Sequence, residues 1–324
     1  MATNKTRDGN AKKTARSSQD RTSKPAAFPD LTVKELLRSF RVTNGKDFRL
    51  KDHPTEDDRK DFDFDKEMSI AHLAAGIDDL KELQEKLYAD NRWSILLIFQ
   101  AMDAAGKDST IAHVMSGVNP QGCQVHAFKK PSEEELDHDF LWRTSKALPE
   151  RGRIGIFNRS YYEEVLVVRV HPEILKKQRI PEKFMGEDIW DRRIKAIRQN
   201  EKFLSRQGFK IIKFFLNVGR DEQKKRLIAR LDDPSKNWKF EAQDIAERAH
   251  WDSYMEAYEA AIRGTASKAA PWYVIPADDK KFMRVAVMAA IRRELKKLDL
   301  AYPQLGPTDK AKLGEAKKLL EAAK

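Results

Sequence analysis

The most constraining feature of this chain is an apolar run that leads directly into a glycine–lysine loop. Residues 93–99 are almost all apolar, and residues 100–110 follow with the sequence QAMDAAGKDST. Backbone N–H groups of a loop that opens a helix favour an anion, and a lysine adds a mobile positive charge. The order strand, Gly106-Lys107, helix therefore predicts a phosphate-binding loop. The predicted phosphate contacts beside Lys107 come from Ala104, Ala105, Gly106, Asp108, Ser109 and Thr110.

The loop departs from the usual G-x-x-x-x-G-K-[ST] pattern. Ala101 stands where the first glycine is expected, and Asp108 replaces the hydroxyl residue that follows the lysine. Asp103 adds a carboxylate that would repel bare phosphate. A carboxylate is favourable there when a divalent cation lies between it and the phosphate, so we predict Asp103 as a metal ligand.

Short apolar runs alternate with longer helical stretches along the chain. The runs lie at about 94–100, 124–128, 153–158, 210–216 and 272–276. This pattern is typical of a parallel sheet covered by helices on both faces. We therefore predict a three-layer α/β/α fold with a five-stranded parallel sheet, in a catalytic domain over 29–300 followed by a helical tail over 301–324. Within it, an irregular segment over 29–75 precedes an amphipathic helix over 76–90.

A charged, tryptophan-bearing insertion, about 232–268, separates a predicted helix at 221–231 from the last strand. In a phosphoryl-transfer enzyme such a segment closes over the reacting phosphates and excludes water, so we predict a mobile lid. The alternative is a structural helical hairpin that does not move. The stripe Trp251, Tyr254, Tyr258 and Ile262 has helical spacing, which indicates packing rather than a platform for a nucleobase.

The chain carries 62 basic and 51 acidic residues, a formal net charge of +11, which favours an anionic partner. Seven of the basic residues lie among polar residues at positions 1–28, so we predict a disordered basic arm there. The sequence shows neither the roughly 20 apolar residues that span a bilayer nor a secretory signal, so we expect a cytoplasmic protein without a membrane partner. The single cysteine, Cys123, is interpreted as a packing residue.

A second polar cluster follows the apolar run at 153–158. Residues at the carboxyl end of a parallel strand lie at the edge where ligands of such sheets bind. Asn158 could reach a metal ion through its carbonyl oxygen, and Arg159 could contact phosphoryl oxygens. Alternatively, Asn158 caps the next helix and Arg159 pairs with Glu163 on a solvent-exposed face.

A third cluster places Arg226 and Arg230 on one face of the predicted helix at 221–231, because they are four residues apart. Two guanidiniums can grip neighbouring phosphoryl groups, although both could instead pair with Asp232 or Asp233. Further predicted phosphate-binding cations are Lys236 and Lys239 at the root of the lid, and Lys129 and Lys130 after the second strand. Arg143, Arg169 and Arg179 could line the same channel, whereas His126 and His171 are given no catalytic role.

Several segments together resemble the polyphosphate kinase 2 family. They are residues 100–110, 113–122, 137–143, 157–163, 233–239 and 270–280. The resemblance implies a P-loop kinase-like fold in which inorganic polyphosphate and a nucleotide exchange a terminal phosphoryl group with Mg²⁺, which Mn²⁺ can replace. The pattern after Arg159-Ser160 is most similar to the one-domain class III group, which phosphorylates both nucleoside mono- and diphosphates. The resemblance also implies a homodimer or homotetramer, and no nucleic acid is expected as a partner.

Carried over position by position, the resemblance assigns catalytic roles to Asp103, Lys107, Arg159, Arg226 and Arg230. Asp103 would hold the metal and accept a proton from the incoming phosphate, and Lys107 would grip the phosphoryl group. Arg159 would hold the nucleotide or the transferred group, and Arg226 and Arg230 would act as lid arginines. Ala101 stands where glycine is common in the family, and Asn158 stands where some relatives have aspartate, which makes Asn158 an uncharged candidate ligand.

Two other functions are compatible with parts of the sequence. An ATP-dependent nucleoside monophosphate kinase would share the loop, the sheet and the lid, and would use ATP as its donor. A non-catalytic polyanion- or nucleic-acid-binding protein would use the basic arm and an inactive loop. Activity with polyphosphate as donor separates both from the polyphosphate kinase hypothesis.

Overall fold

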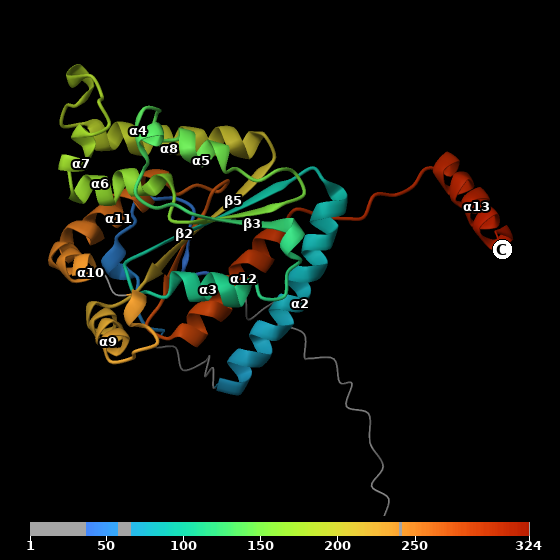
Figure 1. Cartoon of the computed structure of the whole chain (residues 1–324), viewed down its shortest axis with the longest axis horizontal. Coiled ribbons are helices and arrows are strands. Elements are labelled where there is room, and N and C mark those ends of the chain that lie inside the picture. The colour runs from blue at the N-terminus through green and yellow to red at the C-terminus, as the bar shows by residue number, and fades with distance from the viewer. Residues whose placement is uncertain (1–36, 58–65, 240–241, 324) are drawn as a thin grey trace, which may run out of the picture.

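A mixed sheet of six strands forms the centre of the structure, a computed structural model that describes residues 37–57, 66–239 and 242–323 (Figure 1). The predicted basic arm over 1–28 lies outside the described residues. The strand order across the sheet is β1-β6-β5-β2-β4-β3. The strands are β1 (Arg41–Val42), β2 (Ser94–Ala101), β3 (Cys123–Ala127), β4 (Ile154–Asn158), β5 (Phe209–Asn217) and β6 (Trp272–Pro276).

The five predicted strands are all present and run parallel to one another. The predicted number is nevertheless one too low, because β1 adds an antiparallel partner to β6. β1 has only two residues and is therefore too short to show a strand period in the sequence. Since the parallel strands share one direction, the segments that follow β2, β4 and β5 all leave the sheet at its carboxyl edge.

Helices cover both faces of the sheet (Figure 1): α2, α3 and α12 lie on one face, and α6, α8 and α11 lie on the other. Their bounds, with those of the remaining helices, are α2 (Lys66–Asp90), α3 (Lys107–Val114), α4 (Glu133–Leu136), α5 (Trp142–Lys146), α6 (Val167–Val170), α7 (Glu173–Lys176), α8 (Ile189–Arg206), α9 (Arg220–Leu231), α10 (Ala242–Glu247), α11 (Trp251–Thr265), α12 (Lys280–Lys296) and α13 (Pro307–Ala322). Short 3-10 turns occupy η1 (Leu50–Asp52), η3 (Pro120–Gly122), η4 (Tyr161–Val165), η5 (Glu182–Phe184), η6 (Asn237–Lys239) and η7 (Arg248–His250).

The long helix α2 is longer than predicted, and the last helix, α13, lies apart from the core. α2 starts at Lys66 rather than near residue 76, because the charge-rich sequence before it hides the start of the helical pattern. α13 stands away from the body of the molecule, and its residues are exposed throughout (Figure 1). Within the described ranges, no helix combines the length and the apolar character that crossing a bilayer requires.

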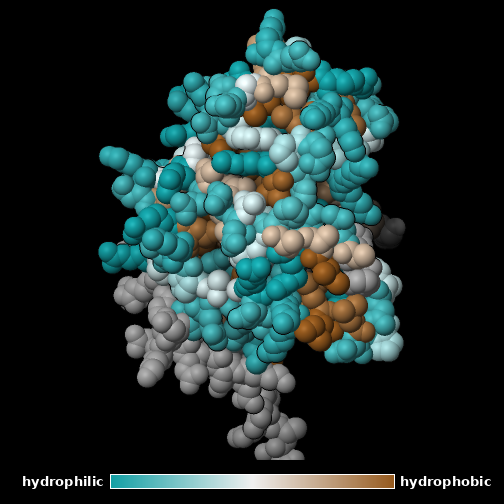
Figure 2. Space-filling model, turned by 90° about the vertical axis from the view of Figure 1, so that its left-hand side faces the viewer, coloured by the Kyte–Doolittle hydropathy of each residue, from teal (hydrophilic) through white to brown (hydrophobic). Residues whose placement is uncertain are grey.

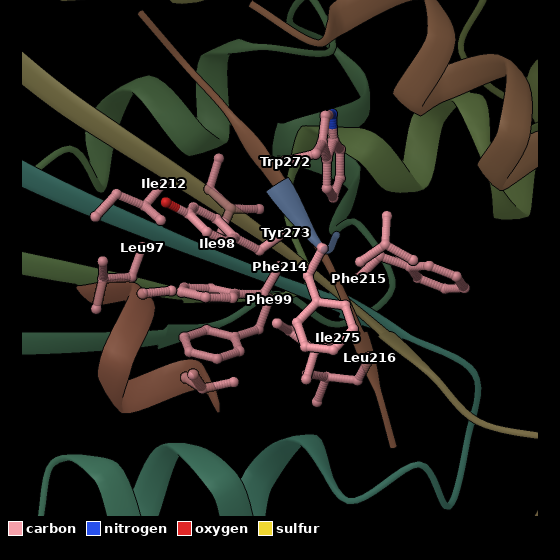
Figure 3. Close-up of a cluster of buried hydrophobic side chains, with 14 of the residues drawn as sticks. Leu97, Ile98, Phe99, Ile212, Phe214, Phe215, Leu216, Trp272, Tyr273 and Ile275 are labelled. Atoms are coloured by element: carbon pink, nitrogen blue, oxygen red, sulfur yellow. The ribbon is translucent and has the colours of Figure 1, made fainter. Parts of the chain in front are cut away.

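The core lies on both faces of β2, β5 and β6 (Figure 3). Phe99 of β2 stacks on Phe214 of β5 with ring centroids 4.8 Å apart, and Tyr273 of β6 stacks on the other side of Phe214. Continuous apolar runs are expected for strands that are covered on both faces. The central strands therefore form a rigid base from which the loops at the carboxyl edge project.

Helix α11 belongs to this core. Its predicted stripe Trp251, Tyr254, Tyr258 and Ile262 is buried, which confirms the packing interpretation. Exposing large apolar side chains costs about 1.5–3 kcal/mol each, so α11 cannot swing away from the sheet as part of a lid. The structure thus places α11 in the core. Of the described residues in the predicted lid, 232–239 and 242–250 lie outside the core before α11 and are called the lid segment below.

A buried ion pair joins β5 to α8. Lys213 is fully buried, and its Nζ lies 2.6 Å from Oε2 of Glu201, which is also buried. The same ammonium donates to Tyr162 Oη and to the carbonyl of Thr265, and both Tyr161 and Tyr162 donate to Glu201. Burial lowers the pKa of Lys213, and Glu201 opposes this shift. One charge pair therefore holds β5, α8, α11 and η4 together.

We expect Lys213→Met to lower the free energy of unfolding by about 3–5 kcal/mol, because it leaves the Glu201 carboxylate buried without its cation. The double variant Lys213→Met/Glu201→Leu should lose less than the sum of the two single variants, because the two side chains interact directly. Urea unfolding followed by circular dichroism measures both effects. Lys317→Met, which removes an exposed pair with Glu321, is the matched control and should leave the midpoint unchanged. Additive losses for the two buried variants would contradict the coupling.

Candidate active site

The predicted phosphate loop lies between β2 and α3. β2 continues through Ala101, which pairs with Leu216 of β5, so the chain at this position is extended strand and needs no glycine. The left-handed positions come later, at Ala104 with φ 60° and at Gly106 with φ 97°. Glycine adopts such φ values without steric strain, whereas alanine does so at a cost of about 1–2 kcal/mol. The first left-handed position therefore comes three residues after Ala101, which explains why Ala101 is compatible with this loop.

Helix α9 holds the carbonyl groups of the loop. Gln223 donates to the carbonyl of Asp103 at 2.9 Å. Nη1 of Arg226 donates to the carbonyls of Ala104 and Ala105 at 3.4 and 2.8 Å. In consequence, three successive carbonyls are directed to α9.

The N–H groups that open α3 are available to a ligand. Within the described residues, the backbone N–H groups of residues 106–109 have no hydrogen-bond acceptor. Four adjacent N–H groups at the start of a helix, on a loop whose carbonyls are held behind it, form an anion-binding cradle. Phosphate binding by the loop backbone stays a prediction, which this arrangement supports.

Lys107 lies inside this cradle. Its residue is 9% exposed, and its ammonium makes no hydrogen bond or ion pair in the part of the chain that the structure describes. Burial lowers the pKa of Lys107 and the nearby Arg159 lowers it further, whereas the carboxylates of Asp103, Glu163 and Asp108 oppose the shift. A buried cation without a fixed partner is prepared to bind an anion that enters the site.

Arg159 and Asp103 face each other across the site. Arg159 Nη2 lies 3.1 Å from Asp103 Oδ1, and Arg159 Nη1 lies 3.9 Å from Glu163 Oε2. The pairing with Glu163 thus exists, but it is not on a solvent-exposed face as the alternative assumed, because the Glu163 side chain is only 14% exposed. Burial raises the pKa of Glu163. When its amide is oriented to suit both neighbours, Gln100 donates to Glu163 at 2.9 Å.

Asn158 binds Asp108, the residue that replaces the usual hydroxyl. Asn158 Nδ2 donates to Asp108 Oδ1 at 2.6 Å, which connects the end of β4 to the start of α3. The alternative role of Asn158 as a helix cap is wrong, because the hydroxyl of Ser160 caps η4 by accepting from Tyr162 N. No described residue donates to the side-chain oxygen Oδ1 of Asn158, which leaves that oxygen for another ligand.

The side-chain hydroxyls of Ser109 and Thr110, which follow Asp108, form hydrogen bonds within the loop. Ser109 and Thr110 both donate to the carbonyl of Gly106, at 2.9 Å each. Thr110 is fully buried. In this structure the Thr110 hydroxyl stabilises the loop, and the phosphate contact of Thr110 stays a prediction.

The two arginines of α9 occupy different environments. Arg226 is buried; besides the loop carbonyls it binds Glu222 and the carbonyls of Ala277 and Asp278. Its donors are all occupied in this conformation, so the structure does not show the predicted pair of guanidiniums facing one site. Arg230 pairs with Asp244 of α10 at 2.8 Å, and Arg226 pairs with Glu222. The alternative prediction that these arginines pair with Asp232 or Asp233 is therefore wrong.

The remaining predicted cations lie around the carboxyl edge. Lys129 and Lys130 are exposed just after β3, next to the end of β4, since Phe128 N donates to the carbonyl of Asn158. Lys236 is exposed and pairs with Asp233. The side chain of Lys239 lies outside the described residues. Figure 2 shows that hydrophilic side chains predominate on the side of the molecule that carries α9 and α10.

Three other candidate residues, Arg143, Arg179 and Cys123, have structural roles. Arg143 donates to the carbonyl of Lys129, and Arg179 pairs with Asp137, so neither is an independent channel residue. Burial raises the pKa of Cys123 to about 11, which keeps the thiol protonated and agrees with a packing role.

The donor set at the loop fits a hard divalent cation. Within the described residues no group of three or more His, Cys, Asp and Glu side chains could hold a metal ion by itself. Mg²⁺ is usually held by one or two protein oxygens together with water and substrate phosphates. The carboxylate of Asp103 and the side-chain oxygen Oδ1 of Asn158 suit such a site, in which the substrate supplies the other ligands.

Sequence reasoning missed Gln223 and Lys280. Gln223 is only 1% exposed, but a glutamine on a charged helix carries no sequence signal of its contact with the loop. Lys280 opens α12, and burial lowers its pKa, as does the positive charge of Arg226, Arg284 and Lys236 around it. A run of cations close in space but distant in sequence could be found only from the fold.

The parallel sheet, the anion-binding loop at its carboxyl edge and the lysine within that loop define a phosphotransferase of the P-loop kinase type. The family model described as polyphosphate kinase 2 matches residues 63–302. The chain belongs to the polyphosphate kinase 2 family, as the sequence resemblance indicated, and is therefore an enzyme. Phosphoryl transfer in kinases uses a divalent metal, which agrees with the oxygen ligands at the loop.

Individual relatives agree with this assignment. The chain is 50% identical over 283 residues to an ADP-polyphosphate phosphotransferase of Rhodopseudomonas palustris, covering 87% of this chain and 97% of the relative. It is 43% identical over 268 residues to an AMP/ADP-polyphosphate phosphotransferase of Meiothermus ruber, covering 83% and 96%. The crystal structure of polyphosphate kinase 2 from Arthrobacter aurescens superposes with a TM-score of 0.76 at 41% identity and covers 87% and 96% of the two chains.

The titration of Lys107 should be visible in the pH dependence of activity. Because burial lowers its pKa, kcat/KM of the free enzyme should fall at a lower alkaline pH than an exposed lysine would cause. Bound phosphates favour the ammonium, so the fall in kcat should lie at higher pH than the fall in kcat/KM. Lys107→Arg should remove the alkaline limb from its residual activity, since a guanidinium stays protonated. A limb that persists unchanged in this variant would assign the titration to another group.

Proposed function

We propose that this enzyme transfers the terminal phosphoryl group of inorganic polyphosphate to ADP and to AMP with Mg²⁺, which Mn²⁺ can replace, as in the class III group. A phosphate oxygen of the nucleotide attacks the terminal phosphorus, the phosphoanhydride bond to the chain breaks, and the polyphosphate leaves one unit shorter. Since one phosphoanhydride replaces another when ADP is the acceptor, the reaction is reversible. The names of the two relatives support both acceptors.

The observation that carries the proposal is the uncommitted Lys107 ammonium inside a cradle of open N–H groups. Phosphoryl transfer needs positioning and positive charge around three phosphoryl oxygens more than it needs a covalent nucleophile. Lys107 would hold the phosphoryl group, and Arg159 would hold the nucleotide phosphates next to it. Mg²⁺ bound by Asp103 and Asn158 would neutralise charge on the phosphates.

The cations around the start of α12 support a path for the polyphosphate donor. Burial and the positive charges of Arg226, Arg284 and Lys236 lower the pKa of Lys280, so these cations lie in the neighbourhood of Lys280. A strip of cations suits a linear polyanion, which binds by releasing condensed counterions. The nucleotide would then enter from the side of Arg159 and of Lys129 and Lys130.

The lid segment would close over the two substrates. Arg230 would act there as a lid arginine, and Arg226 would act by holding the loop. We further propose that the enzyme self-associates as a dimer or tetramer. We also propose a cytoplasmic location, which suits nucleotide substrates.

The decisive assay measures ATP formation from ADP, and ADP and ATP formation from AMP, with polyphosphate and Mg²⁺. The wild-type enzyme should be active, and Asp103→Asn should lose turnover by about 10²-fold or more, because an amide neutralises the charge that holds the metal. Circular dichroism should show that the variant remains folded.

Two results would overturn the proposal. An enzyme that phosphorylates AMP with ATP and ignores polyphosphate would be a nucleoside monophosphate kinase. A chain that binds polyphosphate or RNA and transfers no phosphoryl group would be a binding protein. Near-wild-type activity of Asp103→Asn would remove Asp103 from the site without affecting the activity itself.

The donor path can be tested with two adjacent lysines. Lys280→Ala should raise KM for long-chain polyphosphate several-fold and reduce its salt dependence, because one phosphate contact is lost, while KM for ADP changes little. Lys281→Ala is the matched control, since Lys281 is exposed on the neighbouring position of α12. Equal effects of the two variants would argue for a general charge effect rather than a path at Lys280.

A further inference from the structure

Gln223 contacts the loop with one end of its side chain and the lid segment with the other. Its Nε2 donates to the carbonyl of Asp103 at 2.9 Å, and its Oε1 accepts from Nη1 of Arg248 at 2.6 Å. A backbone carbonyl can only accept and a guanidinium can only donate, so these partners determine the orientation of the amide. At 1% exposure, either polar end would be costly without its partner.

Asp103 is therefore held from two sides. Gln223 binds its carbonyl behind the loop, and Arg159 faces its carboxylate in front. The next residue, Ala104, has a φ of 60°, a conformation that L-residues with a Cβ adopt only when contacts impose it. The hydrogen bond from Gln223 fixes the peptide group between these two residues, and with it the direction of the Asp103 side chain.

Arg248 connects this contact to the lid segment. Arg248 lies in η7 at the end of that segment and also donates to the carbonyl of Arg220 at the start of α9. The preceding residue, Glu247, accepts from His171 Nε2 at 2.9 Å and from Tyr254 Oη at 2.6 Å. Residues 247 and 248 are thus tied to the body on both sides, and a displacement of Arg248 acts on Gln223 directly.

We propose that Gln223 is a positioning residue for Asp103, and that Arg248 acts through it to couple the lid segment to the phosphate loop. The inference rests on the role of Asp103 in the proposed function. In terms of chemistry, the carboxylate is aligned for Mg²⁺ when Arg248 is in place and is released when Arg248 moves. Hydrogen-bonded neighbours of metal ligands commonly change metal affinity without contacting the metal.

The test compares variants that break one end of the contact at a time. Gln223→Glu keeps the shape and the contact with Arg248 but removes the donor to Asp103. We expect a roughly 10-fold or greater rise in the Mg²⁺ concentration for half-maximal rate and a lower kcat, with KM for ADP nearly unchanged. Gln223→Met should act in the same direction. Mn²⁺ binding to the full chain, followed by electron paramagnetic resonance, should weaken in parallel, and amide hydrogen exchange over residues 102–110 should become faster.

The lid end of the contact is tested with Arg248. Arg248→Met should weaken Mn²⁺ binding less than Gln223→Glu does, and Arg248→Lys should restore part of the loss. In the double variant Gln223→Glu/Arg248→Met the effects should not add, because both substitutions break one chain of contacts. Gln84→Glu is the matched control: Gln84 is similarly buried, in α2 against Gly122, and its substitution should affect stability without changing the Mg²⁺ requirement.

The outcomes separate this inference from the proposed function. If the wild-type enzyme is active and Asp103→Asn is not, but both Gln223 variants keep wild-type Mn²⁺ affinity, then Gln223 does not position Asp103. Additive losses in the double variant would exclude the coupling through Arg248. If Asp103→Asn remains active, the assignment of Asp103 itself is wrong, whatever the Gln223 variants do.

Discussion

The buried pair of Lys213 and Glu201 is the interaction on which the architecture of the site depends. It places a full positive charge on the central strand β5, where desolvation is unfavourable unless the charge is paired and hydrogen-bonded. The pair binds Tyr161, Tyr162 and the backbone carbonyl of Thr265. The hydroxyl of Thr265 accepts from the indole of Trp272. Because η4 is fixed to α8 in this way, the strand end that carries Asn158 and Arg159 has one position relative to the phosphate loop.

Within that fixed frame, the phosphate loop has hydrogen-bonded carbonyl groups on one side and open N–H groups on the other. Its carbonyls are bound by α9, and its N–H groups remain open, so binding energy is available only to an anion. The acidic residues do not contradict this, since Asp103 and Glu163 face Arg159 and lower the electrostatic cost of placing two cations side by side. The site thus has positive and negative groups in alternation, an arrangement suited to a phosphate that arrives with a metal ion.

The sequence was sufficient to predict whatever depends on residue type and local period. The five parallel strands, the loop after β2 and the polar residues after β4 all follow from apolar runs that end in a few polar residues. Contacts between distant segments could not be predicted. Spacing places Arg226 and Arg230 on one face of α9, yet only the fold shows that Arg226 reaches loop carbonyls and Arg230 reaches Asp244. Likewise, the helical spacing of apolar residues in α11 would be the same in a core helix and in a movable hairpin, so the sequence could not distinguish the two.

The small antiparallel strand β1 has a consequence for the boundaries of the folded unit. It covers the edge of β6, and the carbonyl of Phe40 accepts a hydrogen bond from Val274, within the most apolar part of the sheet. The family match starts only at residue 63, so a chain trimmed to that match would expose the backbone edge of a buried strand. Unpaired apolar edges recruit strands from other molecules. The segment around Phe40 therefore protects the enzyme from aggregation, although it lies far from the chemistry.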